Sequence, residues 1–214
     1  MIVFPIVATV VAAVFSVATW RASRQGGPAL RVWSIALLQF AVGAGALSWG
    51  IAFGWTPAVY RTFYAFGAVL NVAWLALGTL WLVWYRPAAI VITLVLVAVS
   101  VWVLVVIGEA DLVPGAPAVL EADQLPAARD VMPMLVRNLS RWFSITGSVV
   151  VLVGFLSSLT LLKKKSVGLG LLAGGVVIAG VASELARAGY VAVFSAGLAV
   201  GITTMYAGFV RTRN

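Results

Sequence analysis

The sequence predicts an all-α integral membrane protein: a single domain, residues 1–214, built as a bundle of seven transmembrane helices. Hydrophobic residues make up 63% of the 214 residues, charged residues make up 9%, and the mean hydropathy is +1.11. A soluble domain is about half apolar and about a quarter charged, so this composition is not that of a soluble domain. Seven apolar stretches, each suited to crossing a ~30 Å hydrocarbon core, follow one another along the chain. They lie at about 2–20, 32–53, 60–85, 88–108, 134–162, 167–186 and 189–210.

The third stretch indicates how such a helix packs. Residues 62–85 carry no charge, and as a helix they would extend roughly 36 Å at 1.5 Å per residue. Helical stepping collects tyrosines, glycines and the only amide of the segment on one face, and leaves the opposite face aliphatic and aromatic. A membrane helix with one polar, aromatic and small face normally packs inside a bundle. That face consists of Tyr60, Tyr64, Gly67, Asn71, Trp74, Gly78, Trp81 and Tyr85.

The connections between the stretches are short, with one exception. Gln25–Pro28 and Gly54–Pro57 are typical turns, and Arg86-Pro87 begins the fourth stretch. The segment 109–133 is longer and contains four prolines and five acidic residues. A loop of this length is a functional lid or partner contact, or else a flexible linker. Within it, residues 119–125 have the pattern of a short helix lying over the mouth of the bundle.

The distribution of charge predicts the orientation. The first stretch has no preceding basic residue, and arginines follow it, which favours an uncleaved anchor with its N-terminus outside. Seven crossings then place nine of the fourteen basic residues inside and all six acidic residues outside, as the positive-inside rule requires. We therefore expect a multi-pass plasma-membrane protein whose basic face contacts anionic inner-leaflet lipid, and no binding of nucleic acid. The inner residues are Arg21, Arg24, Arg31, Arg86, Lys163, Lys164, Lys165, Arg211 and Arg213, and the outer acidic residues are Glu109, Asp111, Glu121, Asp123, Asp130 and Glu184.

A weak internal repeat links the third and seventh stretches. Both have aromatic residues at the first two positions of one face and glycine at the third and sixth, with an offset of 130 residues. A parallel duplication of the form 3+1+3 explains this pattern, and so does chance spacing of glycines in apolar helices. The Gly-xxx-Gly spacings at Gly170/Gly174 and Gly197/Gly201 also indicate close helix packing, either within the chain or between copies of it.

Two absent residue types restrict the chemistry. The chain contains no cysteine and no histidine, which excludes disulfides, thiolate metal sites, iron–sulfur clusters and haem with histidine ligation. It also has no cluster of carboxylates within the apolar stretches and no serine in a recognisable nucleophile motif. We therefore expect no metal, no cofactor and no enzymatic activity.

A group of charged residues at the outer helix ends is the first candidate site. Arg141 and Glu184 fall at the outer edge of the hydrocarbon, where a carboxylate is costly unless it is paired. One interpretation is a vestibule in which arginines receive an anionic or polar ligand and Glu184 orients it or accepts a proton. The alternative is structural, with arginines reaching lipid phosphates and Glu184 locking helix ends. The group consists of Arg61, Arg137, Arg141, Glu184 and Arg187.

Polar residues near the middle of the membrane form the second candidate. Ser144 and Ser148 follow Arg141 at helical spacing, while Asn71 and Trp74 occupy the polar face of the third stretch. Together they would line a small cavity at the depth where transporters bind their substrates. The alternative is that Asn71 makes a hydrogen bond between helices and Trp74 packs in the core.

Three functions fit these features. The first is a permease-like protein that binds or transports a small molecule at a site open to the outer face. The second is a non-catalytic subunit or accessory protein of a larger membrane complex, or of a homo-oligomer, with the acidic loop and glycine faces as contacts. The third is a seven-helix sensor or receptor, which the short inner loops disfavour because they leave little surface for an output.

Overall fold

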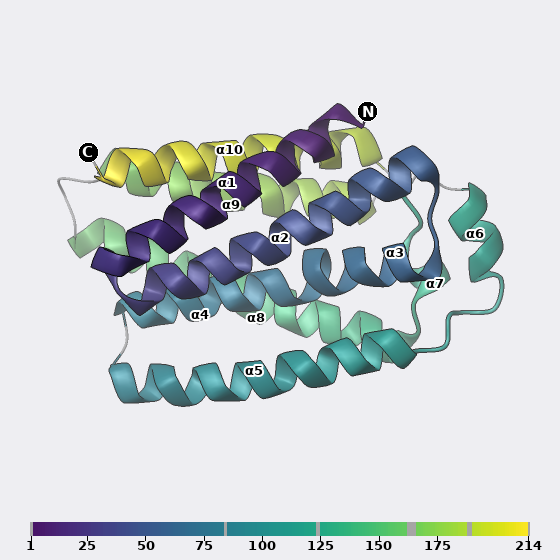
Figure 1. Cartoon of the computed structure of the whole chain (residues 1–214), viewed down its shortest axis with the longest axis horizontal. Coiled ribbons are helices and arrows are strands. Elements are labelled where there is room, and N and C mark those ends of the chain that lie inside the picture. The colour runs from purple at the N-terminus through teal and green to yellow at the C-terminus, as the bar shows by residue number, and fades with distance from the viewer. Residues whose placement is uncertain (1, 84, 123–124, 162–165, 188–189, 214) are drawn as a thin grey trace.

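The computed structural model describes residues 2–83, 85–122, 125–161, 166–187 and 190–213, and all regular structure in these residues is helical. The long helices lie lengthwise side by side, with α5 along one edge (Figure 1). The N-terminus lies at the same end of the bundle as the segment 110–133, which we call the loop end, and the C-terminus lies at the opposite end (Figure 1). The elements are α1 (Val3–Gly26), α2 (Pro28–Phe53), α3 (Pro57–Thr62), η1 (Phe63–Leu70), α4 (Asn71–Val83), α5 (Arg86–Glu109), α6 (Ala116–Ala122), α7 (Ala128–Val131), α8 (Met134–Leu161), α9 (Ser166–Arg187) and α10 (Val191–Arg213).

Six helical segments among the described residues are long and apolar enough to cross a membrane. The chain is therefore a multi-pass membrane protein, and six of the seven predicted stretches are confirmed as candidate spans. The stretch at 134–162 forms α8, a helix of 28 residues. Only part of its side chains is described, so the seventh span stays a prediction. The six are Val3–Gly26, Pro28–Phe53, Pro57–Leu82, Arg86–Glu109, Val167–Ala186 and Val191–Thr212.

The first two helices extend beyond the predicted apolar limits. The prediction ended the first stretch near residue 20, but α1 continues to Gly26 and α2 begins already at Pro28. The turn between them is made by Gly27 at φ 83°, a conformation that glycine adopts without steric cost, and proline suits the first position of the next helix. These boundaries are set by backbone chemistry at the turn and not by the end of the apolar stretch.

The contact between α9 and α10 depends on glycine. A Cβ atom on Gly208 would lie 2.7 Å from the carbonyl oxygen of Gly168, and one on Gly201 would lie 2.8 Å from that of Gly175. Such distances are too short for any side chain, so the two backbones meet directly. The predicted close packing is confirmed at Gly201. At Gly170 no atom lies within 4 Å of the corresponding position, so that glycine is not used in a contact within the described chain.

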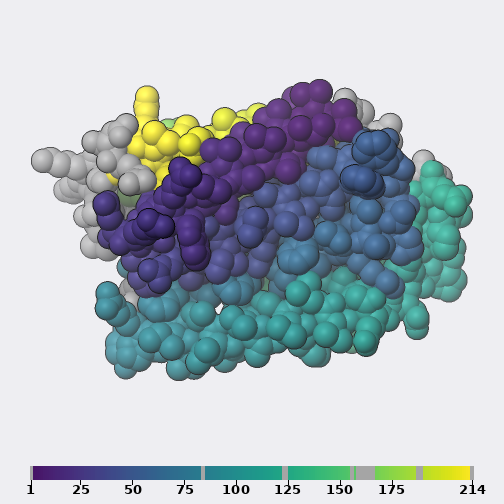
Figure 2. Space-filling model, viewed as in Figure 1, coloured from purple at the N-terminus to yellow at the C-terminus, as the bar shows by residue number. Residues whose placement is uncertain are grey.

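Two indole groups of α4 donate hydrogen bonds to helix α5. Trp74 Nε1 donates a hydrogen bond to Ser100 Oγ at 3.1 Å, and Trp81 Nε1 donates one to Thr93 Oγ1 at 3.0 Å. Otherwise α5 has a mean hydropathy of 3.2 over its most apolar window, of which only 17% is buried. It forms a ridge along one side of the molecule (Figure 2). Most of its surface therefore suits contact with lipid.

The long connection between α5 and α8 packs onto the loop end of the bundle. The Val113 amide donates to the Val131 carbonyl at 3.1 Å, and Ala116, Leu120 and Met132 are at most 2% exposed. Its first helix is Ala116–Ala122, which begins earlier than the predicted 119–125. The buried apolar side chains of α6 and of the α7–α8 junction thus hold this connection against the bundle. Its composition alone had not distinguished a functional lid from a flexible linker. Asp123 lies outside the described residues.

Candidate functional site

A cavity of about 780 Å³ opens inside the loop-end half of the bundle. Its walls come from α2, the α3–η1–α4 segment, α8, α9 and α10, and residues 125–130 lie across its mouth. Small-molecule sites in proteins typically measure about 300–1,000 Å³, so the cavity has the size of a ligand site. Two of its lining residues at the loop end, Ala127 and Arg129, are exposed, which places an opening there.

Close backbone contact between α2 and η1 forms one wall. A Cβ on Gly43 would lie 2.7 Å from both the Cα and the amide nitrogen of Gly67. Gly43 and Gly67 line the cavity together with Ala44 and Ala68. Because all four residues have little or no side chain, the wall here consists largely of backbone and leaves room for the cavity.

The middle of the third apolar stretch is π-helical instead of α-helical, which the sequence did not predict. Segment η1 covers Phe63–Leu70, and two serines of α8 bind to it. Ser140 Oγ and Ser144 Oγ both donate hydrogen bonds to the Ala68 carbonyl, at 3.3 and 3.2 Å. π-helical turns are rare and frequently occur at functional sites. In this protein the π-helical segment lies along the cavity, and hydroxyl groups of the neighbouring helix bind its backbone.

Two arginines of α8 bring positive charge to the cavity. Arg137 is half-buried, and its Nε is buried without a hydrogen-bond partner among the described residues. Arg141 lies one helical turn further along the same face and is exposed. Within the described part of the chain, neither guanidinium is paired with a carboxylate. Asp130, the acidic residue of the lining, lies beside Arg129, with 3.4 Å between Arg129 Nε and Asp130 Oδ2. The net charge of the lining is therefore positive.

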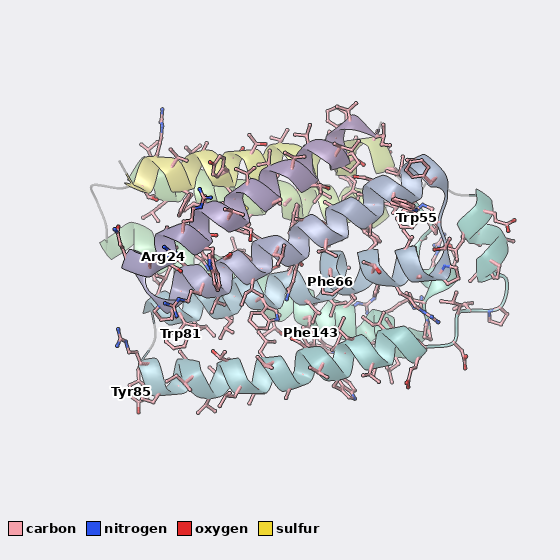
Figure 3. All side chains as sticks on the ribbon, in the orientation of Figure 1. Arg24, Trp55, Phe66, Trp81, Tyr85 and Phe143 are labelled. Atoms are coloured by element: carbon pink, nitrogen blue, oxygen red, sulfur yellow. The ribbon has the colours of Figure 1, made fainter. Side chains whose placement is uncertain are left out.

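An aromatic cluster supports the mouth of the cavity. Tyr60 packs against Trp55, Phe63 and Tyr64, with ring centroids 5.5, 6.1 and 6.2 Å apart, and is only 1% exposed. Its hydroxyl donates a hydrogen bond to the Pro126 carbonyl at 3.0 Å. Trp55 lies at the loop end, whereas Trp81 and Tyr85 lie near the opposite end (Figure 3). Through Tyr60, the cluster ties the α3 helix to the segment that crosses the mouth.

The other half of the bundle is tightly packed. A cavity of about 10 Å³ among Phe15, Trp33, Leu75 and Met205 has room for about one water molecule. Trp33 Nε1 donates to the Leu75 carbonyl at 3.2 Å, and the indole ring lies against Gly78. These side chains fill the interior of the bundle on the side of the large cavity that faces the C-terminus.

Three of the nine predicted site residues meet in the cavity, namely Arg137, Arg141 and Ser144. Arg61 lies elsewhere: its Nη2 donates to the Ala110 carbonyl at 2.7 Å and so holds the end of α5. The indole N–H of Trp74 donates its hydrogen bond to Ser100. Asn71 is buried, and its Oδ1 has no hydrogen-bond partner among the described residues. These residues belong to the packing around the cavity, and their roles as ligand contacts stay predictions.

Of the remaining three predicted residues, Ser148 and Glu184 are not part of the described cavity lining. Ser148 is half-buried on α8, and Glu184 is exposed on α9. Arg187 is the last residue of α9, and its side chain lies outside the described part of the structure. Glu184 therefore does not line the cavity together with Arg137 and Arg141, as the predicted outer charged group would require.

Sequence reasoning missed several lining residues. Ser140 was detectable in principle, because it lies one turn from both Arg137 and Ser144 on α8. Ser183, Phe40 and Phe194 carry no such signal, because a serine or phenylalanine in an apolar helix has no distinctive spacing. The segment 125–130 enters the lining through the fold of the long connection, which its sequence does not determine.

Comparison of the chain with protein-family models, with curated proteins and with solved structures finds no match.

Proposed function

We propose that the protein binds a small molecule in the membrane, in the manner of a permease, and takes it up from the loop end. The observation that carries this proposal is the cavity of about 780 Å³, which opens at the loop end and whose lining has two arginines without a carboxylate partner among the described residues. A site between the helices of a bundle that opens to one side is the arrangement expected of one state of a transporter. The π-helical segment along the wall adds a backbone feature frequent at functional sites.

We propose further that α8 is a seventh span and that the loop end faces outward in the plasma membrane. At 1.5 Å per residue the 28 residues of α8 extend about 42 Å, which exceeds the thickness of the hydrocarbon core. Arg21, Arg24 and Arg86 belong to the end opposite the loop end, and the predicted inner residues Lys163–Lys165 lie outside the described residues. The positive-inside rule assigns that end to the cytoplasm, where it would contact anionic lipid.

Cysteine labelling tests this orientation without background, because the chain has no cysteine of its own. We expect Ala127→Cys, at the exposed mouth of the cavity, to react with a membrane-impermeant maleimide in intact cells. Gln25→Cys and Val167→Cys, both exposed at the opposite end, should react only after permeabilisation. Labelling of Val167→Cys in intact cells would show that α8 does not cross, and a fully reversed pattern would show the opposite orientation.

Native mass spectrometry tests ligand binding. We expect the protein released from its own membrane in mild detergent to carry an additional small-molecule mass. Ser183 lines the cavity, so Ser183→Phe should fill part of it and remove that mass. Val181 lies on the same helix, two residues away and 56% exposed, so Val181→Phe is the matched control and should retain the mass.

The proposal fails if the wild-type protein carries no additional mass, or if the mass persists in Ser183→Phe. A co-purifying polypeptide in place of a small molecule would favour an accessory subunit of a membrane complex. Circular dichroism of both variants checks that the helices are retained.

A further inference from the structure

The cavity lining has more positive than negative side chains, and this excess restricts the charge of the ligand. Arg129 and Asp130 neutralise each other at the mouth, where their side chains are 78% and 44% exposed. Arg137 and Arg141 remain, two like charges one turn apart on α8, facing a cavity with no further described carboxylate. Both lie toward the outer edge of the membrane, and of the two it is Arg137 that is half-buried, where a charge without a partner is costly. An anion in the cavity would supply the missing partner.

The hydroxyl groups of the same wall are already used. Ser140 and Ser144 each have one hydroxyl proton, and both donate it to the Ala68 carbonyl. Among the described α8 side chains of the lining, this leaves the guanidinium groups as the donors free to bind an anion. Guanidinium binds carboxylate and phosphate oxygens through two parallel hydrogen bonds. The buried Nε of Arg137, which has no partner, is one such donor.

Apart from Ser183 and the tyrosines of α3 and η1, most of the remaining wall is apolar. Phe40, Val72, Phe194 and Leu198 line the cavity away from the mouth, and the backbone at Gly43 and Gly67 completes this part. An anion without an apolar part would leave these surfaces in contact with water, so the complementary ligand has an apolar body.

We propose that the cavity binds an amphiphilic anion, with a carboxylate or phosphate group against Arg137 and Arg141 and an apolar body deeper between α2, η1 and α10. This inference rests on the proposed function and names the class of molecule that the site takes. The same chemistry has two sources, a water-soluble organic acid and an acidic lipid.

Binding of defined probes to the full chain in phosphatidylcholine nanodiscs tests the inference. We expect 2-naphthoate to bind at least tenfold more tightly than the neutral 2-naphthalenemethanol, as measured by native mass spectrometry or calorimetry. Arg137→Ala and Arg141→Ala should each weaken naphthoate binding roughly tenfold, since hydrogen bonds to charged groups are the stronger class. Arg24→Ala is the control, because Arg24 is exposed on α1 and is not part of the cavity lining, and it should change binding less than twofold.

A second set of nanodiscs contains phosphatidylglycerol. In one outcome, the wild-type protein retains one phosphatidylglycerol molecule that Arg137→Ala loses, while naphthoate does not bind. This result would identify an acidic lipid as the source and support the inference. The inference is overturned if neither anion binds, if the neutral probe binds as well as naphthoate, or if both arginine variants bind unchanged. Should Arg137→Ala fail to fold, Arg137→Gln and Arg141→Ala serve in its place. The native mass spectrum could also show a neutral or cationic small molecule that is lost in Ser183→Phe. That result would support the proposed function and reject only the anionic ligand class.

Discussion

Replacing Gly43 with alanine is expected to destabilise the protein by about 1–3 kcal/mol, the typical cost of overpacking a tightly packed interior. The added Cβ would lie 2.7 Å from the Cα and amide nitrogen of Gly67, and both of these are backbone atoms that no side-chain rotation can move. Helix α2 would therefore have to separate from η1, which opens the wall of the cavity. The measurement is the thermal unfolding midpoint of the purified protein, followed by intrinsic fluorescence.

Gly45→Ala is the matched control for this change. Gly45 lies in the same helix, and its added Cβ would meet the Thr9 Cγ2 at 3.7 Å, an ordinary contact distance. Alanine has a higher helix propensity than glycine at both positions, so the two variants differ only in how closely the added Cβ approaches a neighbouring helix. Equal unfolding midpoints for Gly43→Ala and Gly45→Ala would contradict the contact between α2 and η1.

Replacing Tyr60 with alanine is expected to cost about 3–5 kcal/mol, as is typical for removing a large aromatic side chain from a core. The ring is 1% exposed and packs against Trp55, Phe63 and Tyr64 at the mouth of the cavity. Its removal deletes the centre of that cluster, and the segment 125–130 loses the hydrogen bond at Pro126. The free energy of unfolding and hydrogen exchange across residues 125–132 measure the two effects.

Tyr60→Phe separates the hydrogen bond from the packing. The ring stays, but the buried Pro126 carbonyl loses its donor, which should cost about 1 kcal/mol and speed exchange in the segment 125–132. Unchanged exchange in Tyr60→Phe would mean that the hydroxyl does not hold the segment in place. A loss as large as that of Tyr60→Ala would mean that the ring contributes little.

Much of the fold was predictable because lipid imposes simple requirements on the chain. A charge-free apolar stretch in a membrane must form a helix, since every backbone polar group needs a partner within the chain. The polar face of the third stretch was accordingly predicted to pack inside, and Tyr60, Tyr64, Asn71 and Trp74 are all buried. The prediction was wrong at the end of that face, where Tyr85 is 67% exposed. Helix ends were less predictable, because they depend on single turn residues such as Gly27.

The cavity was predictable only where residue type and spacing carry information. Arg137, Arg141 and Ser144 stand out as polar residues at helical spacing in an apolar context, and the structure brings them together. Arg61 stands out equally, yet it binds the Ala110 carbonyl. A lone charge near a helix end does not reveal which neighbour it meets, because that depends on how the helices pack. The π-helical segment was not predicted because the spacing of residues from Tyr60 to Asn71 also fits an α-helix.

The π-helical segment also affects how the chain tolerates insertion and deletion. Each residue of an α-helix turns the chain by about 100°, at 3.6 residues per turn. A π-helical turn closes its hydrogen bond one residue later than an α-helical turn, so it takes up an additional residue with little rotation of the helix on either side. Removing one residue from Phe63–Leu70 would therefore shorten the segment toward an ordinary α-helix and leave Tyr60 near Pro126 and Trp74 near Ser100. Removing one residue from α4 between Asn71 and Trp74 would instead turn Tyr60 away by about 100°. The chain between these two anchors therefore tolerates a single deletion in the π-helical segment and not in the α-helix beside it.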